Sequence, residues 1–235
     1  MQIKNQIAIV TGASAGLGRA ISQTLVKKGA TVYGLARNAD KLHKLQQELG
    51  KLFKPVTIDL CDEIAIRDWV TSTFHENYSP QILINNAGTS QFADVDQLSA
   101  ADWHAMINTN LNAVHFMTAA VVPLMKKQTE VSYIVQIGSI LGKVSGSQKS
   151  AYSATKFAIQ GYSEALFKEL RGFNIKVTCL NPGSINTDFF KNSGIIKNDH
   201  MLQPNEIADV ITFLLETPDN VLIDELTLRP LRPKP

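Results

Sequence analysis

The chain has 235 residues, of which 44% are apolar and 19% charged, and 23 basic against 21 acidic side chains give a formal net charge of +2. This composition is ordinary for a folded globular protein, and it excludes a disordered chain, a collagen-like chain and a disulfide scaffold. The near balance of charge gives no basic face for nucleic acid, and no apolar run approaches the roughly 20 residues of a membrane helix. Because only Cys61 and Cys179 are present and no signal-like segment is found, we expect a cytoplasmic protein.

Short apolar runs alternate with helix-like patterns along the whole chain. Most of these runs are continuously apolar, which is typical of strands covered on both faces in a parallel sheet. Strands separated by helices predict βαβ units with right-handed crossovers, and therefore an α/β fold with a doubly wound, mostly parallel sheet. The predicted strands are residues 7–11, 31–36, 56–59, 82–85, 133–138, 176–181 and 222–228.

Helices are predicted where apolar residues recur at spacings of three and four. Gly29 is the expected C-terminal cap of the first helix, Asp62 is the expected N-cap of the second, and Pro123 is expected to kink or end the third. Because no linker interrupts the alternation, we expect one domain over residues 1–235, with 229–235 as an extended, solvated tail. The predicted helices cover residues 17–29, 62–74, 99–125, 150–170 and 205–215.

The first predicted strand leads directly into a glycine-rich turn and then into a helix. The turn reads Thr11-Gly12-Ala13-Ser14-Ala15-Gly16-Leu17-Gly18, a G-x-x-x-G-x-G spacing rather than G-x-G-x-x-G. Glycines allow a sharp turn, and they let the N–H groups of a helix N-terminus approach the pyrophosphate of a dinucleotide. An ordinary tight turn is the alternative, but the flanking strand and helix favour a dinucleotide site.

The end of the second strand indicates which dinucleotide binds. NAD-binding folds usually carry an acidic residue about 20 residues beyond the glycines, where it bonds the ribose 2′-hydroxyl. This chain has Ala36-Arg37-Asn38 there, and a guanidinium can bind the 2′-phosphate of NADP(H) with two hydrogen bonds. We therefore predict NADP(H) as the cofactor. The alternative is that Arg37 only begins the next helix in solvent.

Seven motifs follow one another in order along nearly the whole chain. They are Thr11-Gly12-x-x-x-Gly16-x-Gly18, Asp59-Leu60, Asn85-Asn86-Ala87-Gly88, Asn110, Ser139, Tyr152-x-x-x-Lys156, and Asn181-Pro182-Gly183 followed by Thr187. Together they resemble the short-chain dehydrogenase/reductase family in its short, single-domain form. The resemblance implies a Rossmann-type sheet of seven strands in the order 3-2-1-4-5-6-7 with helices on both faces. It also implies an NADP(H)-dependent oxidoreductase that reduces a carbonyl to an alcohol, or the reverse.

Four residues are candidates for the chemistry. Tyr152 and Lys156 are four residues apart and therefore share one face of a helix. Reduction of a carbonyl needs a proton donor, for which we predict Tyr152, and we expect the nearby ammonium of Lys156 to lower the pKa of this tyrosine. The resemblance implies that Ser139 holds the carbonyl oxygen and that Lys156 also bonds the nicotinamide ribose. It implies that Asn110 supports a water that relays protons to Lys156.

The resemblance also implies which residues contact the cofactor. Asn85 is expected to tie its strand to the sheet instead. The five histidines form no ligand cluster, so we predict no metal. The implied cofactor residues are Gly12, Ser14, Gly16, Leu17, Gly18, Arg37, Asp59, Leu60, Asn86, Ala87, Gly88, Tyr152, Lys156, Pro182, Gly183, Ile185 and Thr187.

Three loops, at residues 89–96, 141–150 and 188–203, are expected to determine the substrate. The last of them forms either an apolar lid or ordinary packing through Phe189, Phe190, Ile195 and Ile196. Lysines in these loops either attract an anionic substrate or are simply solvated, the more usual case. These lysines are Lys143, Lys149, Lys191 and Lys197.

The C-terminal sequence lacks the Gly-rich strand and Asp-Gly-Gly tail of many tetrameric family members. It resembles the ending of the serine-dehydrogenase, sepiapterin-reductase and small carbonyl-reductase groups. We expect a homodimer or homotetramer associating through the helices at 99–125 and 150–170, and a small-molecule carbonyl or alcohol as substrate. Two alternatives remain. One is an NADP(H)-binding redox sensor without turnover, and the other is an epimerase or dehydratase that uses the same Tyr-x-x-x-Lys pair.

Overall fold

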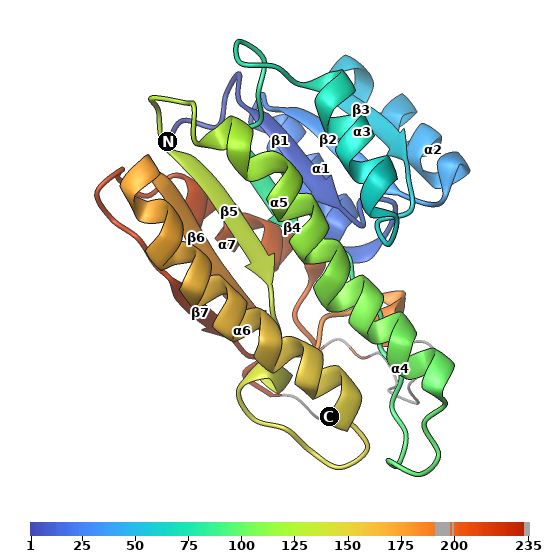
Figure 1. Cartoon of the computed structure of the whole chain (residues 1–235). Coiled ribbons are helices and arrows are strands. Elements are labelled where there is room, and N and C mark those ends of the chain that lie inside the picture. Colours follow the sequence, from blue (N-terminus) through green and yellow to red (C-terminus); the bar gives the residue numbers. More distant parts are fainter. Residues whose placement is uncertain (191–197, 199, 233–235) are drawn as a thin grey trace.

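The computed structural model describes residues 1–190, 198 and 200–232. In this part of the chain, seven parallel strands form one sheet in the order β3-β2-β1-β4-β5-β6-β7 (Figure 1). This order confirms the predicted doubly wound, Rossmann-type fold. The strands are β1 (Ile7–Thr11), β2 (Thr31–Ala36), β3 (Phe53–Thr57), β4 (Ile82–Asn85), β5 (Ser132–Ile137), β6 (Ile175–Pro182) and β7 (Glu225–Leu228).

Helices cover both faces of the sheet. Helices α1, α2 and α7 pack on one face, and helices α3, α5 and α6 pack on the other. None of the helices in the described ranges is both long and apolar enough to cross a membrane. The helices are α1 (Gly16–Lys27), α2 (Ala39–Leu49), α3 (Glu63–Thr73), α4 (Ala100–Ile107), α5 (Ala113–Met125), α6 (Ser150–Leu170) and α7 (Pro204–Leu215).

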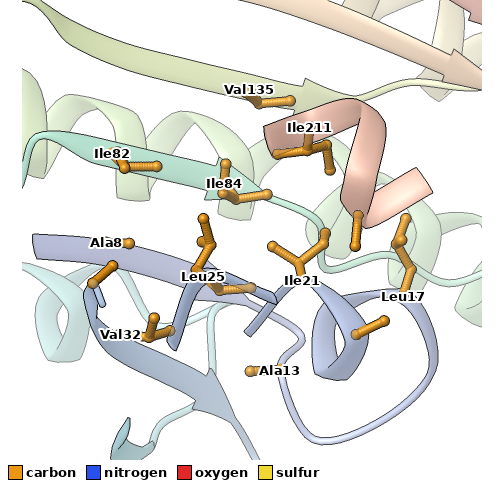
Figure 2. Close-up of a cluster of buried hydrophobic side chains, with 14 of the residues drawn as sticks. Ala8, Ala13, Leu17, Ile21, Leu25, Val32, Ile82, Ile84, Val135 and Ile211 are labelled. Atoms are coloured by element: carbon orange, nitrogen blue, oxygen red, sulfur yellow. The ribbon is translucent and has the colours of Figure 1, made fainter. Parts of the chain in front are cut away.

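The two apolar cores follow from the sequence pattern of the strands. Strands β1 and β4 are buried at every position, so each supplies apolar side chains to both faces. Figure 2 shows Ile21 and Leu25 of α1 packed beside Ile82 and Ile84 of β4, with Ile211 of α7 adjacent. Burial of this apolar surface holds the helices against the sheet.

The carboxyl ends of β1 and β4 meet where the strand order reverses, and a side-chain network ties them together. The hydroxyl oxygen of Thr11 accepts hydrogen bonds from the backbone N–H groups of Asn86 (2.9 Å) and Ala87 (3.0 Å). In return, Nδ2 of Asn86 donates to the carbonyl of Thr11 at 2.9 Å. In open α/β sheets this switch point is where ligands bind.

The long helix predicted over residues 99–125 is interrupted in the structure. A π-helical turn, Asn108–Asn112, separates α4 from α5. Pro123 lies inside α5, which ends two residues later at Met125. Single π turns within helices often occur at functional sites.

The largest differences from prediction occur at one edge of the sheet. Strand β3 covers Phe53–Thr57 instead of 56–59, because the buried Phe53 pairs with Val32 of β2. This edge strand is half exposed and contains Pro55, so it has no continuous apolar run. Helix α2, which was not predicted, buries only Leu42 and Leu45.

The other boundaries differ less. Strand β7 begins at Glu225 rather than 222, and the ends of β5 and β6 differ from prediction by one residue. Beyond β7, residues 229–232 have no helix or strand, and Leu231 and Arg232 are exposed. Residues 233–235 of the predicted tail lie outside the described residues.

Candidate active site

A cavity of about 690 Å³ opens at the carboxyl ends of the strands. It is lined by the glycine turn after β1 and by the ends of the five strands β2 to β6, so it lies across the switch point of the sheet. Three of the four predicted catalytic residues line it, and so do all but one of the predicted cofactor residues. These residues are Gly12, Ser14, Gly16, Leu17, Arg37, Asp59, Leu60, Asn86, Ala87, Gly88, Ser139, Tyr152, Lys156, Pro182, Gly183, Ile185 and Thr187.

The glycine turn is shaped for close approach of another molecule. Gly12 and Gly16 have φ values of 69° and 52°, a left-handed conformation that favours glycine. A Cβ atom on Gly16 would lie 3.2 Å from the side chain of Thr187 across the cavity, and one on Gly12 would lie 3.0 Å from the Cα of Ala87. Larger residues at either position would fill the space beside the N-terminus of α1.

Gly18 is the predicted cofactor residue that does not line the cavity. A Cβ atom there would lie 2.3 Å from the carbonyl oxygen of Gly12 and 2.6 Å from Nδ2 of Asn86. The glycine is therefore required for packing of α1 against the turn and the end of β4, and its contact with the cofactor stays a prediction.

Arg37 lies at the cavity end next to β2 and β3. Helix α2 begins two residues later, at Ala39, because the side-chain oxygen of Asn38 caps it by accepting from the backbone N–H of Lys41 at 2.9 Å. Arg37 thus stands before the helix and beside the cavity, where Asp59 is also found.

Ser139, Tyr152 and Lys156 lie together at the opposite end, where β5 meets α6. The oxygen of the Ser139 hydroxyl accepts from the backbone N–H of Leu141 at 3.1 Å, which leaves its proton to donate. It hydrogen-bonds the hydroxyl of Tyr152. The ring of Tyr152 packs against those of Phe92 and Phe189, with centroids 5.7 Å and 6.1 Å away.

The pKa of Tyr152 moves opposite to the predicted direction. The side chain is only 4% exposed, and burial raises its pKa because the interior disfavours the tyrosinate. The hydrogen bond from Ser139 offsets part of this effect by stabilising the charged form. The expectation that Lys156 lowers this pKa is wrong for this structure, in which the lysine ammonium bonds a backbone carbonyl instead.

Lys156 is a buried cation at the base of the cavity. Its Nζ donates to the carbonyl of Ile137 at 2.7 Å and lies 5.7 Å from the centroid of the Tyr152 ring. Burial lowers the pKa of Lys156 to about 8. Near neutral pH the side chain is therefore a cation that loses its proton more readily than an exposed lysine.

This lowered pKa predicts a pH dependence of stability. An ordinary lysine titrates at 10.5, so between pH 8 and 10.5 the unfolded chain binds a proton that the folded chain does not. The free energy of unfolding therefore rises with pH in this window, by about 3 kcal/mol in total from this residue. We expect the melting temperature of Lys156→Met relative to wild type to fall between pH 8 and pH 10, because only the wild type gains this stability.

Thermal unfolding of both proteins at pH 7, 8, 9 and 10 measures the effect. Lys168→Met is the matched control, because Lys168 lies on the same helix but is exposed beside Glu164. A difference between Lys156→Met and wild type that stays constant over this range would contradict the burial of the ammonium.

Asn110 lies in the π-helical turn, is 1% exposed and does not line the cavity. Its Oδ1 accepts from the backbone N–H of Thr89 at 2.8 Å, and its Nδ2 donates to the carbonyl of Thr89 and to the hydroxyl of Thr155. The side chain thus joins the loop after β4 to helix α6, one residue before Lys156. Asn85 does not line the cavity, and its Nδ2 donates to Thr118 of α5 at 3.0 Å, so its side chain ties β4 to a helix rather than to the sheet.

Some lining residues were missed by the sequence analysis. Several are neighbours of motif residues, and adjacency to a motif was the available signal. Thr109 reaches the cavity through the π turn beside Asn110, and Phe189, which was expected only as part of a lid or of ordinary packing, reaches it through the segment after β6. The missed residues are Ala15, Ala36, Asn38, Ile58, Cys61, Thr109, Ile137, Gly138, Asp188 and Phe189.

The loops expected to determine the substrate are described in part. Lys143 pairs with Glu225, and Nζ of Lys149 lies 5.8 Å from the centroid of the Phe92 ring. Phe189 belongs to a short 3₁₀ turn. The remaining lid candidates and lysines, at 191, 195, 196 and 197, lie outside the described residues, as does the side chain of Phe190. Among the described residues, no three His, Cys, Asp or Glu side chains form a group able to hold a metal ion.

Comparisons with known proteins identify the family. A family model described as short chain dehydrogenase matches residues 6–196. The chain is 30% identical over 223 residues to the 3-oxoacyl-acyl-carrier-protein reductase of Vibrio harveyi, with 91% of each chain covered. Its structure is similar to that of a serine dehydrogenase complexed with NADP+ (TM-score 0.87, 29% identity, 94% of each chain). It is also similar to an alcohol dehydrogenase from Thermococcus sibiricus complexed with 5-hydroxy-NADP (TM-score 0.88, 26% identity, 99% of each chain). With its ordered motifs, its sheet order and these matches, the chain belongs to the short-chain dehydrogenase family.

Proposed function

We propose that the protein is an NADP(H)-dependent oxidoreductase that reduces a carbonyl to an alcohol, or catalyses the reverse reaction. The observation that carries the proposal is that one cavity is lined by the glycine turn and Arg37 as well as by Ser139, Tyr152 and Lys156. Two structural neighbours are complexed with NADP+ or with an NADP derivative, which supports the choice of cofactor.

The residues present fit a dinucleotide. The turn from Gly12 to Leu17 would hold the pyrophosphate, because its glycines leave room beside the free N–H groups at the N-terminus of α1. Arg37 is an exposed cation without an acidic residue at the end of β2, and it would bind the 2′-phosphate. The other implied cofactor residues that line the cavity, from Asp59 to Thr187, would complete the site.

The chain's own residues supply acid–base and orienting functions. A bound nicotinamide ring supplies or accepts the hydride. The Ser139 hydroxyl, its oxygen held by Leu141, donates to the carbonyl oxygen of the substrate, and Tyr152 transfers its proton to the same oxygen as negative charge develops there. Lys156, whose ammonium donates to the carbonyl of Ile137 at the base of the cavity, would bond the nicotinamide ribose. Asn110 holds the loop after β4 against α6 and would support a water that returns protons to Lys156.

Cofactor preference tests the role of Arg37. Replacement by alanine removes charge-assisted hydrogen bonds worth about 1.5–3 kcal/mol, so we expect the Kd for NADPH to rise by about 10- to 100-fold. The Kd for NADH should stay nearly constant, because NADH lacks the 2′-phosphate. Titration of protein fluorescence with each cofactor measures both constants.

Arg19→Ala is the matched control for this experiment. Arg19 lies on α1 near the glycine turn, but its guanidinium pairs with Glu48 at 2.7 Å and does not line the cavity. An unchanged ratio of the two Kd values in Arg37→Ala would overturn the assignment of NADP(H) through this residue.

The reaction is tested by incubating the protein with NADPH and, separately, NADH, together with ketones, aldehydes, diketones and 3-oxoacyl esters. Loss of nicotinamide absorbance with a carbonyl compound supports a reductase. Cofactor binding without turnover of any compound supports the redox sensor instead, and turnover without a net redox change supports an epimerase or dehydratase.

We propose that the protein works in the cytoplasm as a homodimer or homotetramer. Both cysteines are free thiols, as expected in a reducing compartment. Trp103 of α4 and Phe157 of α6 are 41% and 47% exposed, and both lie on the segments expected to associate. Sedimentation equilibrium measures the assembly, and a monomer at micromolar concentration would exclude it.

A further inference from the structure

A directed series of hydrogen bonds leads from the backbone of Ser139, at the cavity wall, to three side chains that do not line the cavity. The backbone N–H of Ser139 donates to Oδ1 of Asn181 at 3.1 Å, and Nδ2 of Asn181 donates to Oε1 of Gln160 at 2.9 Å. Nε2 of Gln160 then donates to Oε2 of Glu225 at 2.7 Å. The series thus joins the end of β5 to β6, α6 and the first residue of β7.

The absence of a side chain at Gly138 leaves room for the amide of Asn181 beside Ser139. A Cβ atom at position 138 would lie 2.1 Å from Oδ1 of Asn181, so a side chain there would push the amide away from Ser139. Asn181 is fully buried, and its position is therefore determined by these contacts.

The groups at the two ends of this hydrogen-bond series, the N–H of Ser139 and the carboxylate of Glu225, determine the orientation of the amides of Asn181 and Gln160. A backbone N–H can only donate, and an ionised carboxylate can only accept. With Ser139 at one end and Glu225 at the other, each amide can satisfy all its partners in one orientation only. Hydrogen bonds aligned in this way also strengthen one another.

The same carboxylate closes a ring with the loop after Ser139. Lys143, four residues beyond Ser139, pairs with the other carboxylate oxygen of Glu225. The short 3₁₀ turn Ile140–Gly142 lies between these two attachment points, and its first N–H groups include the one that bonds the Ser139 hydroxyl. Ser139 and Lys143, at the two ends of this segment, are therefore both connected to the carboxylate of Glu225, Ser139 through Asn181 and Gln160 and Lys143 directly.

We propose that Asn181, Gln160 and Glu225 are positioning residues, and that the acceptor-only carboxylate of Glu225 orients the two amides so that Ser139 is held for catalysis. This inference rests on the proposed role of Ser139 in the reaction. It assigns these residues no contact with substrate or cofactor.

Gln160→Leu removes the two hydrogen bonds that Gln160 makes with Asn181 and Glu225. This change should lower kcat by about 10- to 100-fold, the scale of a misplaced catalytic group. The Kd for NADPH should change less than twofold, because the cofactor residues remain in place. Hydrogen–deuterium exchange in peptides covering residues 138–143 should be at least tenfold faster. The matched control is Gln128→Leu, which removes an amide–amide hydrogen bond of the same 2.9 Å length from Gln81, remote from the cavity.

Two further variants distinguish the role of Glu225 as a hydrogen-bond acceptor for Gln160 from its role in the ion pair with Lys143. Glu225→Gln removes the charge but keeps an oxygen that can accept from Gln160, and the donor-only N–H of Ser139 still selects the same orientation of both amides, so kcat should remain within threefold of wild type. The double variant Lys143→Glu/Glu225→Lys keeps an ion pair but places a donor-only group at Gln160. That arrangement favours inverted amides, with the NH₂ of Asn181 facing the N–H of Ser139, and should lower kcat as strongly as Gln160→Leu.

The opposite ranking, with the double variant active and Glu225→Gln impaired, would show that the ion pair alone matters and would overturn the proposal. Unchanged exchange at 138–143 in Gln160→Leu would also overturn it. The exchange measurement needs no turnover, so it tests the hydrogen-bond series even if the proposed carbonyl reduction fails. Failure of the proposed function would be recognised separately: the wild-type protein would then not oxidise NADPH with any carbonyl compound of the panel.

Discussion

Tyr152→Phe is expected to slow NADPH oxidation with a carbonyl substrate by about 10²- to 10⁴-fold, the range contributed by a positioned general acid. The substitution removes only the hydroxyl, and a phenylalanine ring keeps the contacts with Phe92 and Phe189. The raised pKa of Tyr152 keeps its proton in place at neutral pH, as reduction of a carbonyl requires. Steady-state kinetics with the best substrate from the panel, together with the Kd for NADPH, measures the effect.

Tyr162→Phe is the matched control, because Tyr162 lies on the same helix and its hydroxyl bonds His115 outside the cavity, at 3.2 Å. We expect its kcat to remain within twofold of wild type. If Tyr152→Phe retained full activity with a correctly folded protein, Tyr152 would not be the acid, and the proposed mechanism would fail.

Gly18→Ala is expected to have the largest effect on the glycine turn, although Gly18 does not line the cavity. The added Cβ would lie 2.3 Å from a backbone carbonyl oxygen, where no flexible side chain can move aside. The turn and α1 must shift apart, which costs about 1–3 kcal/mol as overpacking and disturbs the N–H groups that would hold the pyrophosphate. We expect a lower melting temperature and at least a tenfold weaker affinity for NADPH.

Gly161→Ala provides the control for helix propensity. Gly161 is also helical, but a Cβ atom there would meet no other atom within 4 Å. Alanine should stabilise α6 by about 0.5–1 kcal/mol and leave the Kd for NADPH unchanged. Thermal unfolding and cofactor titration of the two variants give the comparison, and equal Kd values would contradict the packing role of Gly18.

Much of the fold could be predicted because its signals are local. Strands β1 and β4 are buried on both faces, so their sequences are apolar up to the last residue of each strand and were recognised directly. Helix α6 was predicted with its observed boundaries, and its period places Tyr152 and Lys156 on one face. The edge strand β3 is half exposed and has no continuous apolar run, and helix α2 is mostly polar and buries only Leu42 and Leu45, so both were harder to recognise.

The family, the strand–turn–helix at the start of the chain and most of the predicted residues that line the cavity could be recognised from the sequence, because these depend on residue type and short spacings. The effects of burial and of distant contacts on those residues depend on how the helices pack against the sheet. Packing of α6 against β6 and against the turn after β5 buries Tyr152 and Lys156 and moves their pKa values in opposite directions, a desolvation effect that no spacing predicts. Likewise, Asn181 and Gln160 connect Ser139 to Glu225 by hydrogen bonds between residues that lie 21 to 65 positions apart in the sequence and that the parallel sheet brings side by side.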